Sequence, residues 1–485
     1  MSIALVVGLM MESVPLALAQ PDLYPPPSFS QPLNSSPSRE AESQLPTRMP
    51  ASQPDDGDTQ PIDLLNAYER MLLNDPQVHA ARAARDADLD AKNIARAALL
   101  PRISINYLRN QTRQKEYISQ GEQKLYIEDS YYGHRASLTI EQSLFDYSAI
   151  STYRMGKTQA EQAEVLYRLQ FQQEAVALID AYLNALLARD SLELARQQLH
   201  VYQDLLRDNK RMMTAGEGTR IDILETRTEL SATQSELLTY KNALADRLRE
   251  LAALVGGLVQ ARQLLAIDLG SALPLPQDDL VTLVADALQQ NPEVQAARLA
   301  VRYNDLTIER EKGQFMPRVS IYATHDRVDS DTINNQGRDF NTNTVGLQVS
   351  IPLFSGGSSY YTTRQAYNRR EQARHELQRS SDSTRTLLEQ YYRVSATSGE
   401  RVRTLRQNVS DAFALIEAMR KSVAGGERTN TDALHAERQA YQARQELLRT
   451  YVEWFQAWAK LQFYAGRFSE DDVLLLNRQL VAHAQ

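Results

Sequence analysis

The sequence predicts an α+β membrane protein in which a transmembrane β-barrel is joined to long α-helical coiled coils. Three observations predict this fold. Most of the chain consists of two copies of one sequence pattern, with its motifs in the same order. Long stretches without proline carry apolar residues at seven-residue spacing, which is typical of coiled coils. Between these stretches, four short segments alternate apolar and polar residues, as strands with one apolar face do.

The internal tandem repeat covers most of the chain. Corresponding pairs are Pro76 and Pro292, Pro101 and Pro317, Phe145 and Phe354, and Asp222 and Asp432. A unit of this length is no short solenoid repeat, so we assign two helix–hairpin–helix modules, residues 62–274 and 275–466, followed by a C-terminal tail, residues 467–485. The offset between the copies falls from 216 at the prolines to 209 at the phenylalanines, so the first hairpin is seven residues longer.

Two segments precede the first module. Residues 1–19 are typical of an export signal peptide, because an apolar run from Ile3 to Met11 is followed by Ala17-Leu18-Ala19, a small-x-small cleavage site. No Lys or Arg precedes the run, so we expect a few natural N-terminal residues to be missing here; a buried apolar segment is the alternative. Residues 20–61 hold ten of the 18 prolines and predict a disordered leader.

Long helices are predicted both by the absence of proline and by periodicity. Proline would break a helix, and residues 102–273 and 353–485 contain none. The expected helices cover about 148–212, 219–255, 358–423 and 430–465. Leu230, Leu237 and Leu244 are seven residues apart, as in a coiled-coil seam. A helix of roughly 60 residues is about 90 Å long, which exceeds a compact domain and indicates a rod.

Four segments between the helices change to a period of two. They begin at Ile103, Leu138, Val319 and Val345, and each alternates apolar with polar residues. The stretches between them, about 110–135 and 326–342, are polar, and we expect them to be long loops. Each pair of segments therefore predicts a hairpin with one apolar and one polar face.

The hairpins favour a membrane barrel over a soluble sheet packed on the helices, although strand pattern alone leaves both open. Four strands cannot close a barrel, and lipid does not tolerate unpaired edges, so closure requires strands from other copies of the chain. Tyrosines in or beside the hairpins suit the aromatic girdles of such a barrel. They are Tyr107, Tyr117, Tyr126, Tyr131, Tyr132, Tyr147, Tyr360 and Tyr361.

The composition excludes several function classes. The chain contains no cysteine, which removes thiol catalysis, thiolate metal sites, disulfides and an acylated lipoprotein N-terminus. Its seven histidines are scattered, so we expect no metal centre and no cofactor. The net charge of -8 comes from interspersed charges without a basic block, which predicts no nucleic-acid binding. No catalytic motif is present, and we expect no enzymatic activity.

The turn joining the two long helices of each module is the candidate functional site. Gly216 and Gly426 suit a left-handed helix end. Thr219 and Thr429 suit the next helix's N-cap, and Asp222 and Asp432, three residues on, complete capping boxes. Local capping accounts for these residues without any further role. The two copies differ here, with Arg220 against Asn430 and Glu225 against His435.

Taken together, these motifs resemble the outer-membrane factor family, the TolC-like exit ducts of Gram-negative export systems, and within it the type I secretion subgroup. The resemblance covers residues 62–466 and rests on the order and duplication of its motifs. These are Asn-Pro-Glu-Val-Gln-Ala-Ala at 291–297, Pro-Arg-[Ile/Val]-Ser-Ile at 101 and 317, Pro-Leu-Phe-Ser-Gly-Gly at 352–357, and Gly-x-x-Thr-x-x-Asp-[Ile/Ala]-Leu at 216 and 426.

The resemblance implies a homotrimer in the outer membrane. Each protomer would supply four strands to a shared twelve-stranded barrel, and the helices would form a tunnel across the periplasm. The channel would be passive, with outer-membrane lipid around it and an exported protein passing through it. A periplasmic adaptor (membrane fusion) protein would link it to an inner-membrane ABC transporter or, alternatively, an efflux transporter.

The resemblance also gives the turns a role in gating. It implies that Asp432 lies in an acidic ring at the pore mouth, that Asp222 is the acidic residue of the first turn, and that Arg428 joins the links that hold the mouth shut. The sequence departs from the family where His435 replaces a second ring aspartate and Val423 replaces a gating tyrosine. His435 would make the mouth titratable near neutral pH, or is simply solvated.

Three functions are compared. Type I secretion of a protein such as a protease is favoured over tripartite drug or small-molecule efflux, because many efflux ducts of this family are lipoproteins and this chain has no cysteine to acylate. A poreless periplasmic coiled-coil protein is the alternative outside the family. The alternating strands, duplicated at matching positions, speak against it.

Overall fold

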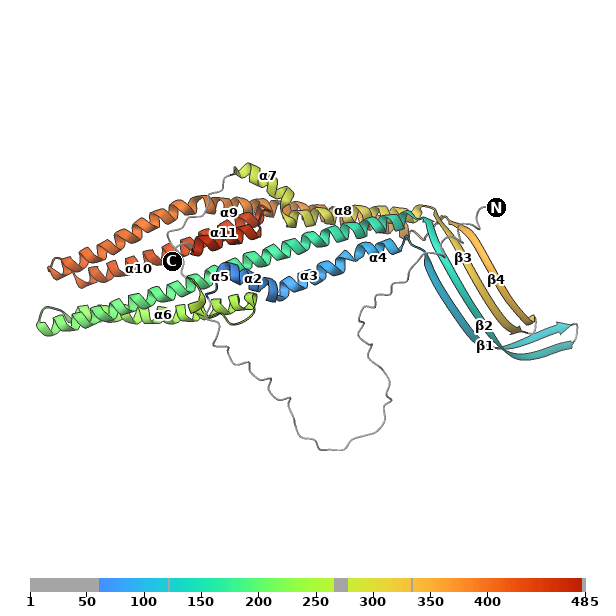
Figure 1. The fold of residues 1–485 in the computed structure, drawn as a ribbon, viewed down its shortest axis with the longest axis horizontal. Coiled ribbons are helices and arrows are strands. Elements are labelled where there is room, and N and C mark those ends of the chain that lie inside the picture. The colour runs from blue at the N-terminus through green and yellow to red at the C-terminus, as the bar shows by residue number, and fades with distance from the viewer. Residues whose placement is uncertain (1–60, 121–122, 266–277, 333–334, 482–485) are drawn as a thin grey trace, which may run out of the picture. The chain divides into compact units, whose positions relative to one another are not determined.

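The computed structural model describes residues 61–120, 123–265, 278–332 and 335–481. The signal peptide and all of the leader except Pro61 lie outside these residues. The described residues belong to one compact unit, Thr59–Gln485. The two modules follow the same order of helices, hairpin and paired long helices (Figure 1). Shorter helices precede each hairpin: α2 (Leu64–Asn74), α3 (Pro76–Leu89) and α4 (Ala91–Ala97), then α7 (Leu280–Gln290) and α8 (Pro292–Lys312).

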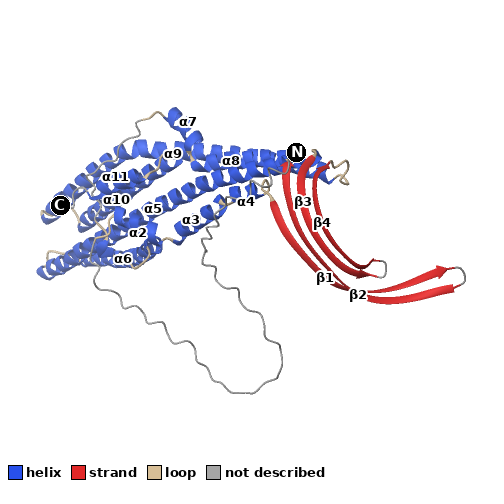
Figure 2. Ribbon diagram, turned by 45° about the vertical axis from the view of Figure 1, so that its right-hand side comes forward, coloured by secondary structure: helices blue, strands red, loops and turns tan. Residues whose placement is uncertain are grey.

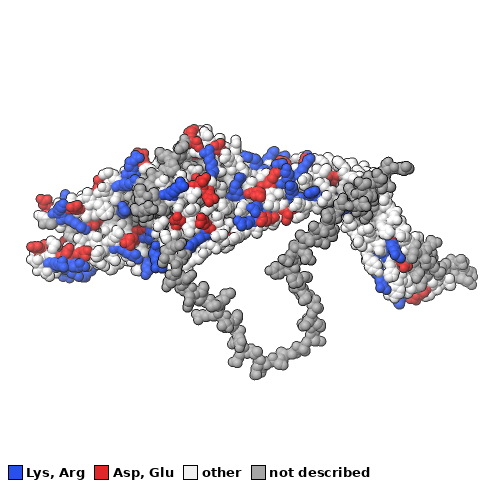
Figure 3. All heavy atoms as spheres, in the orientation of Figure 1, with Lys and Arg blue, Asp and Glu red and all other residues white. Residues whose placement is uncertain are grey.

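The four predicted long helices are confirmed, with ends within three residues of those expected. They are α5 (Tyr147–Ala215), α6 (Arg220–Val255), α9 (Ser358–Ala424) and α10 (Asn430–Tyr464). Side-chain caps set their starts where the sequence permits: Asp146 accepts a hydrogen bond from the backbone N–H of Ala149 at the start of α5. Charges of both signs are interspersed along the helices on the face shown in Figure 3. None of the described helices has the length and apolar character needed to span a membrane.

The four strands form one antiparallel sheet in chain order, β1-β2-β3-β4 (Figure 2). They are β1 (Arg102–Gln120), β2 (Gln123–Phe145), β3 (Arg318–Thr332) and β4 (Asn335–Ser350). The expected long loops at about 110–135 and 326–342 are wrong. The strands take up the described residues of both stretches, because a β ladder is held by backbone hydrogen bonds that polar side chains do not interrupt. The seven extra residues of the first hairpin therefore lengthen its strands.

The register gives the sheet one apolar and one polar face. Ile103 lies beside Ile140, which lies beside Ala323, which lies beside Val345. The neighbouring row is Ser104, Thr139, Thr324 and Thr344. The apolar face is uncovered: Ile105 is 77% exposed, Val345 72% and Leu347 63%. An exposed apolar surface of this extent on a folded chain marks an interaction with lipid or with another protein.

The main core lies partway along the long helices, where short segments wrap around them. Ile62 forms a parallel bridge with Leu264, and the hydroxyl of buried Tyr182 donates to the carbonyl of Ile62 at 3.0 Å. The C-terminal tail contains helix α11 (Glu470–Val481), in which Leu476 is fully buried. Asn477 of this helix accepts a hydrogen bond from the backbone N–H of Leu64 at 3.0 Å, so both ends of the described chain meet in the core.

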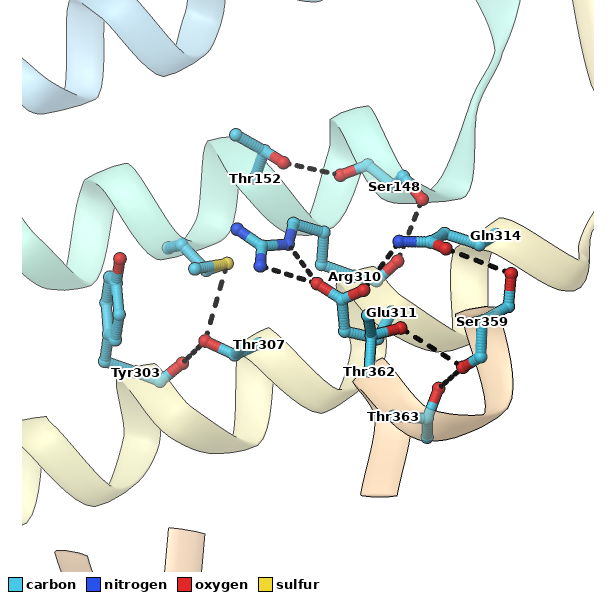
Figure 4. Close-up of polar contacts among 11 residues, drawn as sticks. Ser148, Thr152, Tyr303, Thr307, Arg310, Glu311, Gln314, Ser359, Thr362 and Thr363 are labelled. Atoms are coloured by element: carbon cyan, nitrogen blue, oxygen red, sulfur yellow. Dashed lines mark hydrogen bonds and ion pairs between the residues drawn. The ribbon is translucent and has the colours of Figure 1, made fainter. Parts of the chain in front are cut away.

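A polar cluster joins three helices where they meet the sheet (Figure 4). The almost fully buried carboxylate of Glu311 accepts hydrogen bonds from Arg310 at 2.6 Å and from Gln314 at 2.6 Å. Ser359, at the start of α9, donates to Gln314, and Ser148, at the start of α5, donates to the carbonyl of Arg310. In the chain, α5 follows β2, α8 precedes β3 and α9 follows β4, so these bonds join the helix ends nearest to three of the strands.

A close helix contact generates the first prediction. Gly156 of α5 lies against α4, and an added Cβ would stand 2.6 Å from the carbonyl oxygen of Ala91. Gly156→Ala should therefore lower the free energy of unfolding by about 1–3 kcal/mol. In an uncrowded helix the same change stabilises by roughly 0.5–1 kcal/mol, so the two cases differ in sign.

The measurement is thermal unfolding followed by far-UV circular dichroism. Gly425→Ala is the matched control, because a Cβ there would lie 3.6 Å from its nearest neighbours, and it should leave the Tm unchanged or slightly higher. A Gly156→Ala protein as stable as the parent would contradict the close contact.

Candidate functional site

The two turns that join the long helices lie at the end of the helices remote from the sheet (Figure 1). Gly216 and Gly426 adopt left-handed backbone with φ of 83° and 78°. Beside each, the helix ends in the same pair of bonds. Gly216 and Glu217 donate their N–H groups to the carbonyls of Met213 and Met212, and Gly426 and Glu427 donate theirs to the carbonyls of Val423 and Ser422. This is the arrangement in which glycine satisfies the last carbonyls of a helix.

Both predicted capping boxes are present. The backbone N–H of Thr219 donates to the carboxylate of Asp222 at 2.8 Å, and the N–H of Asp222 donates back to the threonine hydroxyl at 3.2 Å. Thr429 and Asp432 repeat this at 3.1 and 3.3 Å. Each aspartate is thus held at a helix N-terminus, where a negative charge is favourable.

The surroundings of Asp432 favour its charged form. Hydrogen bonds from the backbone N–H and hydroxyl of Thr429 lower the pKa of this carboxyl below its usual 3.8, and the nearby Arg428 and His435 act in the same direction. Arg428 lies exposed on the turn itself. The second turn therefore keeps an anionic group beside a cationic one in water.

Contacts between the two helix pairs were not predicted from the sequence. The side-chain amide of buried Asn209, in α5, donates to Thr226 of α6 at 2.9 Å and to the amide oxygen of Asn430 at 3.3 Å. Thr431 donates to Glu225 at 2.7 Å. The N-terminus of α10 is thus fastened to the first pair. Asn430 and Glu225 both occupy positions where the two copies differ. This difference is the feature of the sequence that could have indicated a contact between the helix pairs.

Arg438 extends this contact along α10. Its guanidinium donates to Glu229 of α6 at 2.9 Å and to the imidazole Nδ1 of His435 at 2.6 Å. His435 also lines an open depression of about 270 Å³ between α6 and α10, together with Leu224. The structure thus places His435 between the two helix pairs.

Within the second pair, a buried carboxylate joins α9 to α10. Glu437, only 3% exposed at its side chain, accepts hydrogen bonds from Arg420 at 2.5 and 3.1 Å. Loss of the half-exposed Arg420 would leave the buried carboxylate of Glu437 without its charge partner, so this contact links the two helices. Among the described residues, no cluster of His, Asp and Glu is arranged to hold a metal ion.

The charge of Asp432 generates the second prediction. Asp432→Asn should lower the Tm at neutral pH, because the folded state favours the carboxylate. Since the pKa in the folded state is depressed, this stability is fully present above the unfolded value of about 3.8 and is lost as the pH falls through the folded value.

Thermal unfolding of both proteins between neutral and acidic pH measures this effect. The difference in Tm should shrink once the pH drops below about 3.8. Glu427→Gln changes another exposed carboxylate of the same turn and should leave the Tm nearly unchanged. A difference for Asp432→Asn that stays constant over the whole range would show that its charge contributes nothing.

The chain matches known proteins over most of its length. The family model described as outer membrane efflux protein matches residues 67–257 and 283–467. The alkaline protease secretion protein AprF of Pseudomonas aeruginosa is 34% identical over 425 residues, covering 87% of this chain and 88% of AprF. The proteases secretion protein PrtF of Dickeya chrysanthemi is 32% identical, with 87% and 91% covered. The outer membrane protein TolC of Vibrio cholerae is 24% identical, with 86% and 94% covered.

Solved structures share the fold. A crystal structure of CusC matches with a TM-score of 0.73 at 16% identity, covering 88% of this chain and 99% of CusC. The outer membrane protein VceC from Vibrio cholerae matches with a TM-score of 0.70 at 17% identity, covering 83% and 96%. A mostly helical chain with one curved sheet is therefore confirmed, as is an outer-membrane location. The chain belongs to the outer membrane efflux protein family.

Proposed function

We propose that this protein is the outer-membrane exit duct of a type I secretion system that exports a protease. Three copies form a passive channel that catalyses no reaction. A periplasmic adaptor protein connects it to an inner-membrane ABC transporter, which supplies the energy. The observation that carries the proposal is the identity of 34% and 32% to two protease secretion proteins over 87% of the chain.

The sheet supports a shared barrel. Its apolar face is exposed and its opposite face is polar, as in barrels that meet lipid outside and water inside. Twelve pairs join β2 to β3, enough for a tilted strand of about 9–11 residues to cross a membrane. The outer edges of β1 and β4 carry no partner within the described residues. Three copies of four strands would pair every edge.

The turns support a role at the periplasmic mouth of the tunnel. Arg428 lies on the turn between α9 and α10, at the helix ends remote from the sheet, and Asp222 and Asp432 lie in the first turns of α6 and α10. His435 lies further along α10. In a trimer, three copies of Asp432 would form an anionic ring, which favours cations. The bonds from Asn430, Thr431 and Arg438 to the first helix pair would have to break before the pairs could separate.

The export role generates the third prediction. Deleting the gene should abolish protease activity in the culture medium and leave the enzyme inside the cells, because the duct is its exit. Protease assays of medium and lysate, with drug susceptibility measured in parallel, test this. Unchanged secretion combined with increased drug sensitivity would indicate tripartite efflux. Recovery of the chain as a soluble periplasmic monomer would contradict the proposal that it forms an outer-membrane duct.

The mouth generates the fourth prediction. Asp432→Asn should reduce the cation selectivity of single channels in planar bilayers, because it removes three charges from the proposed ring while leaving an oxygen that can accept the bonds of Thr429.

Thr429→Val is the matched control, because it removes the capping hydroxyl and keeps the aspartate. It should cost about 1 kcal/mol of stability and leave ion selectivity unchanged. Equal ion selectivity in the parent and in Asp432→Asn would show that the aspartate acts only as a capping residue.

A further inference from the structure

The first hairpin extends well beyond the second. Strands β1 and β2 run on together past the ends of β3 and β4 (Figure 2). Residues 111–120 pair with residues 123–132, from Gln111 opposite Tyr132 to Gln120 opposite Gln123. The last pair between β2 and β3 in this direction joins Gly133 to Ser330. These ten pairs form a two-stranded ribbon about 33 Å long, which we call the β1–β2 ribbon.

The ribbon shows large apolar and aromatic side chains to solvent. Tyr117 is 72% exposed, Leu125 58% and Tyr126 47%. The two tyrosine rings lie against each other with centroids 5.1 Å apart. Both edges of the ribbon are without a partner strand among the described residues. An isolated two-stranded ribbon is marginally stable in water, and open edges attract further strands. A single ribbon therefore lacks the neighbouring strands that would stabilise it.

The ribbon lies outside the membrane in the proposed duct. The twelve pairs between β2 and β3 already provide a membrane-crossing length, and the helices leave the sheet at the opposite strand ends. The ribbon therefore stands on the outer side of the barrel. Each protomer has one ribbon, because β3 and β4 end only a few residues past this level.

The charges of the two edges complement each other. Residues 111–120 of β1 contain Arg113, Lys115 and one acidic residue, so this edge is net basic. Residues 123–132 of β2 contain Glu128, Asp129 and one basic residue, so this edge is net acidic. Within one ribbon, Lys115 already lies 3.6 Å from Glu128. The same attraction can act between the basic edge of one copy and the acidic edge of the next.

We propose that the three β1–β2 ribbons associate above the barrel, with β2 of each copy beside β1 of the next, and form a six-stranded collar at the outer exit. This interaction surface rests on the proposed trimeric duct, since it continues the closure of the barrel by neighbouring copies. Barrel diameter grows roughly in proportion to strand number, so passing from twelve strands to six about halves it. Side chains already fill the interior of an eight-stranded barrel, so a closed six-stranded collar shuts the exit at the end opposite the periplasmic turns, and the ribbons separate when an exported chain passes.

Spin labels test this directly, because the chain has no cysteine and accepts single ones without background. Gln114→Cys places a label on the ribbon, and Asn341→Cys places one on β4 in the four-stranded part, where Asn341 pairs with Arg327. Electron paramagnetic resonance of the protein in outer-membrane lipid gives the distances between copies. The collar predicts a distance at Gln114 about half that at Asn341.

Three outcomes decide the matter. A distance at Gln114 equal to or longer than that at Asn341 overturns the collar while the trimer stands; ribbons lying on the lipid surface would give this result. The absence of any distance between copies at Asn341 overturns the trimer and the collar together. A shorter distance at Gln114 supports the collar, and combining Tyr117→Ser with Tyr126→Ser should then lengthen it without changing the distance at Asn341.

Discussion

The open edges of the four-stranded sheet are the constraint on which the rest of the structure depends. The sheet ends in β1 on one side and β4 on the other, without further described strands to pair them. Its apolar face suits lipid, but lipid cannot hydrogen-bond to unpaired backbone groups. In the proposed duct, the chain would therefore reach its stable state only beside other copies. The order of elements fits this requirement, because each module contributes one hairpin to the sheet and one pair of long helices.

Three sets of contacts hold the helices together between the sheet and the turns. At the sheet, Glu311 and its partners hold three helices where they meet the strands. In the main core, the segment at Ile62 and helix α11 wrap around the long helices. At the turns, Asn209 and Arg438 connect the two pairs. Apolar packing thus holds the middle of the helices, and polar contacts join the two pairs near the turns, so in the proposed duct an opening at the turns would leave the core intact.

Features that depend on the spacing of residues close together in the chain could be predicted from the sequence. Helix ends and capping boxes rest on residues three apart, such as Thr429 and Asp432, and these were found. The strands were located, but their length was missed, because residues 111–120 and 123–132 are mostly polar and only backbone pairing shows that they continue the ladder. The bond between Asn209 and Asn430 joins residues far apart in the chain, so no local pattern reveals it. A comparison of the two copies does single out Asn430, because Arg220 stands at the corresponding position of the first copy, and duplicated residues that make the same contacts tend to stay alike.

The number of chains in the assembled particle tests the central claim most directly. Native mass spectrometry of the protein extracted from outer membranes gives this number without assuming any function. Closure of the sheet by neighbouring copies predicts a particle of three chains that dissociates only under conditions that disrupt the barrel. A particle that remains a single folded chain, with the edges of β1 and β4 protected from hydrogen exchange, would contradict the account, because the sheet would then have completed itself.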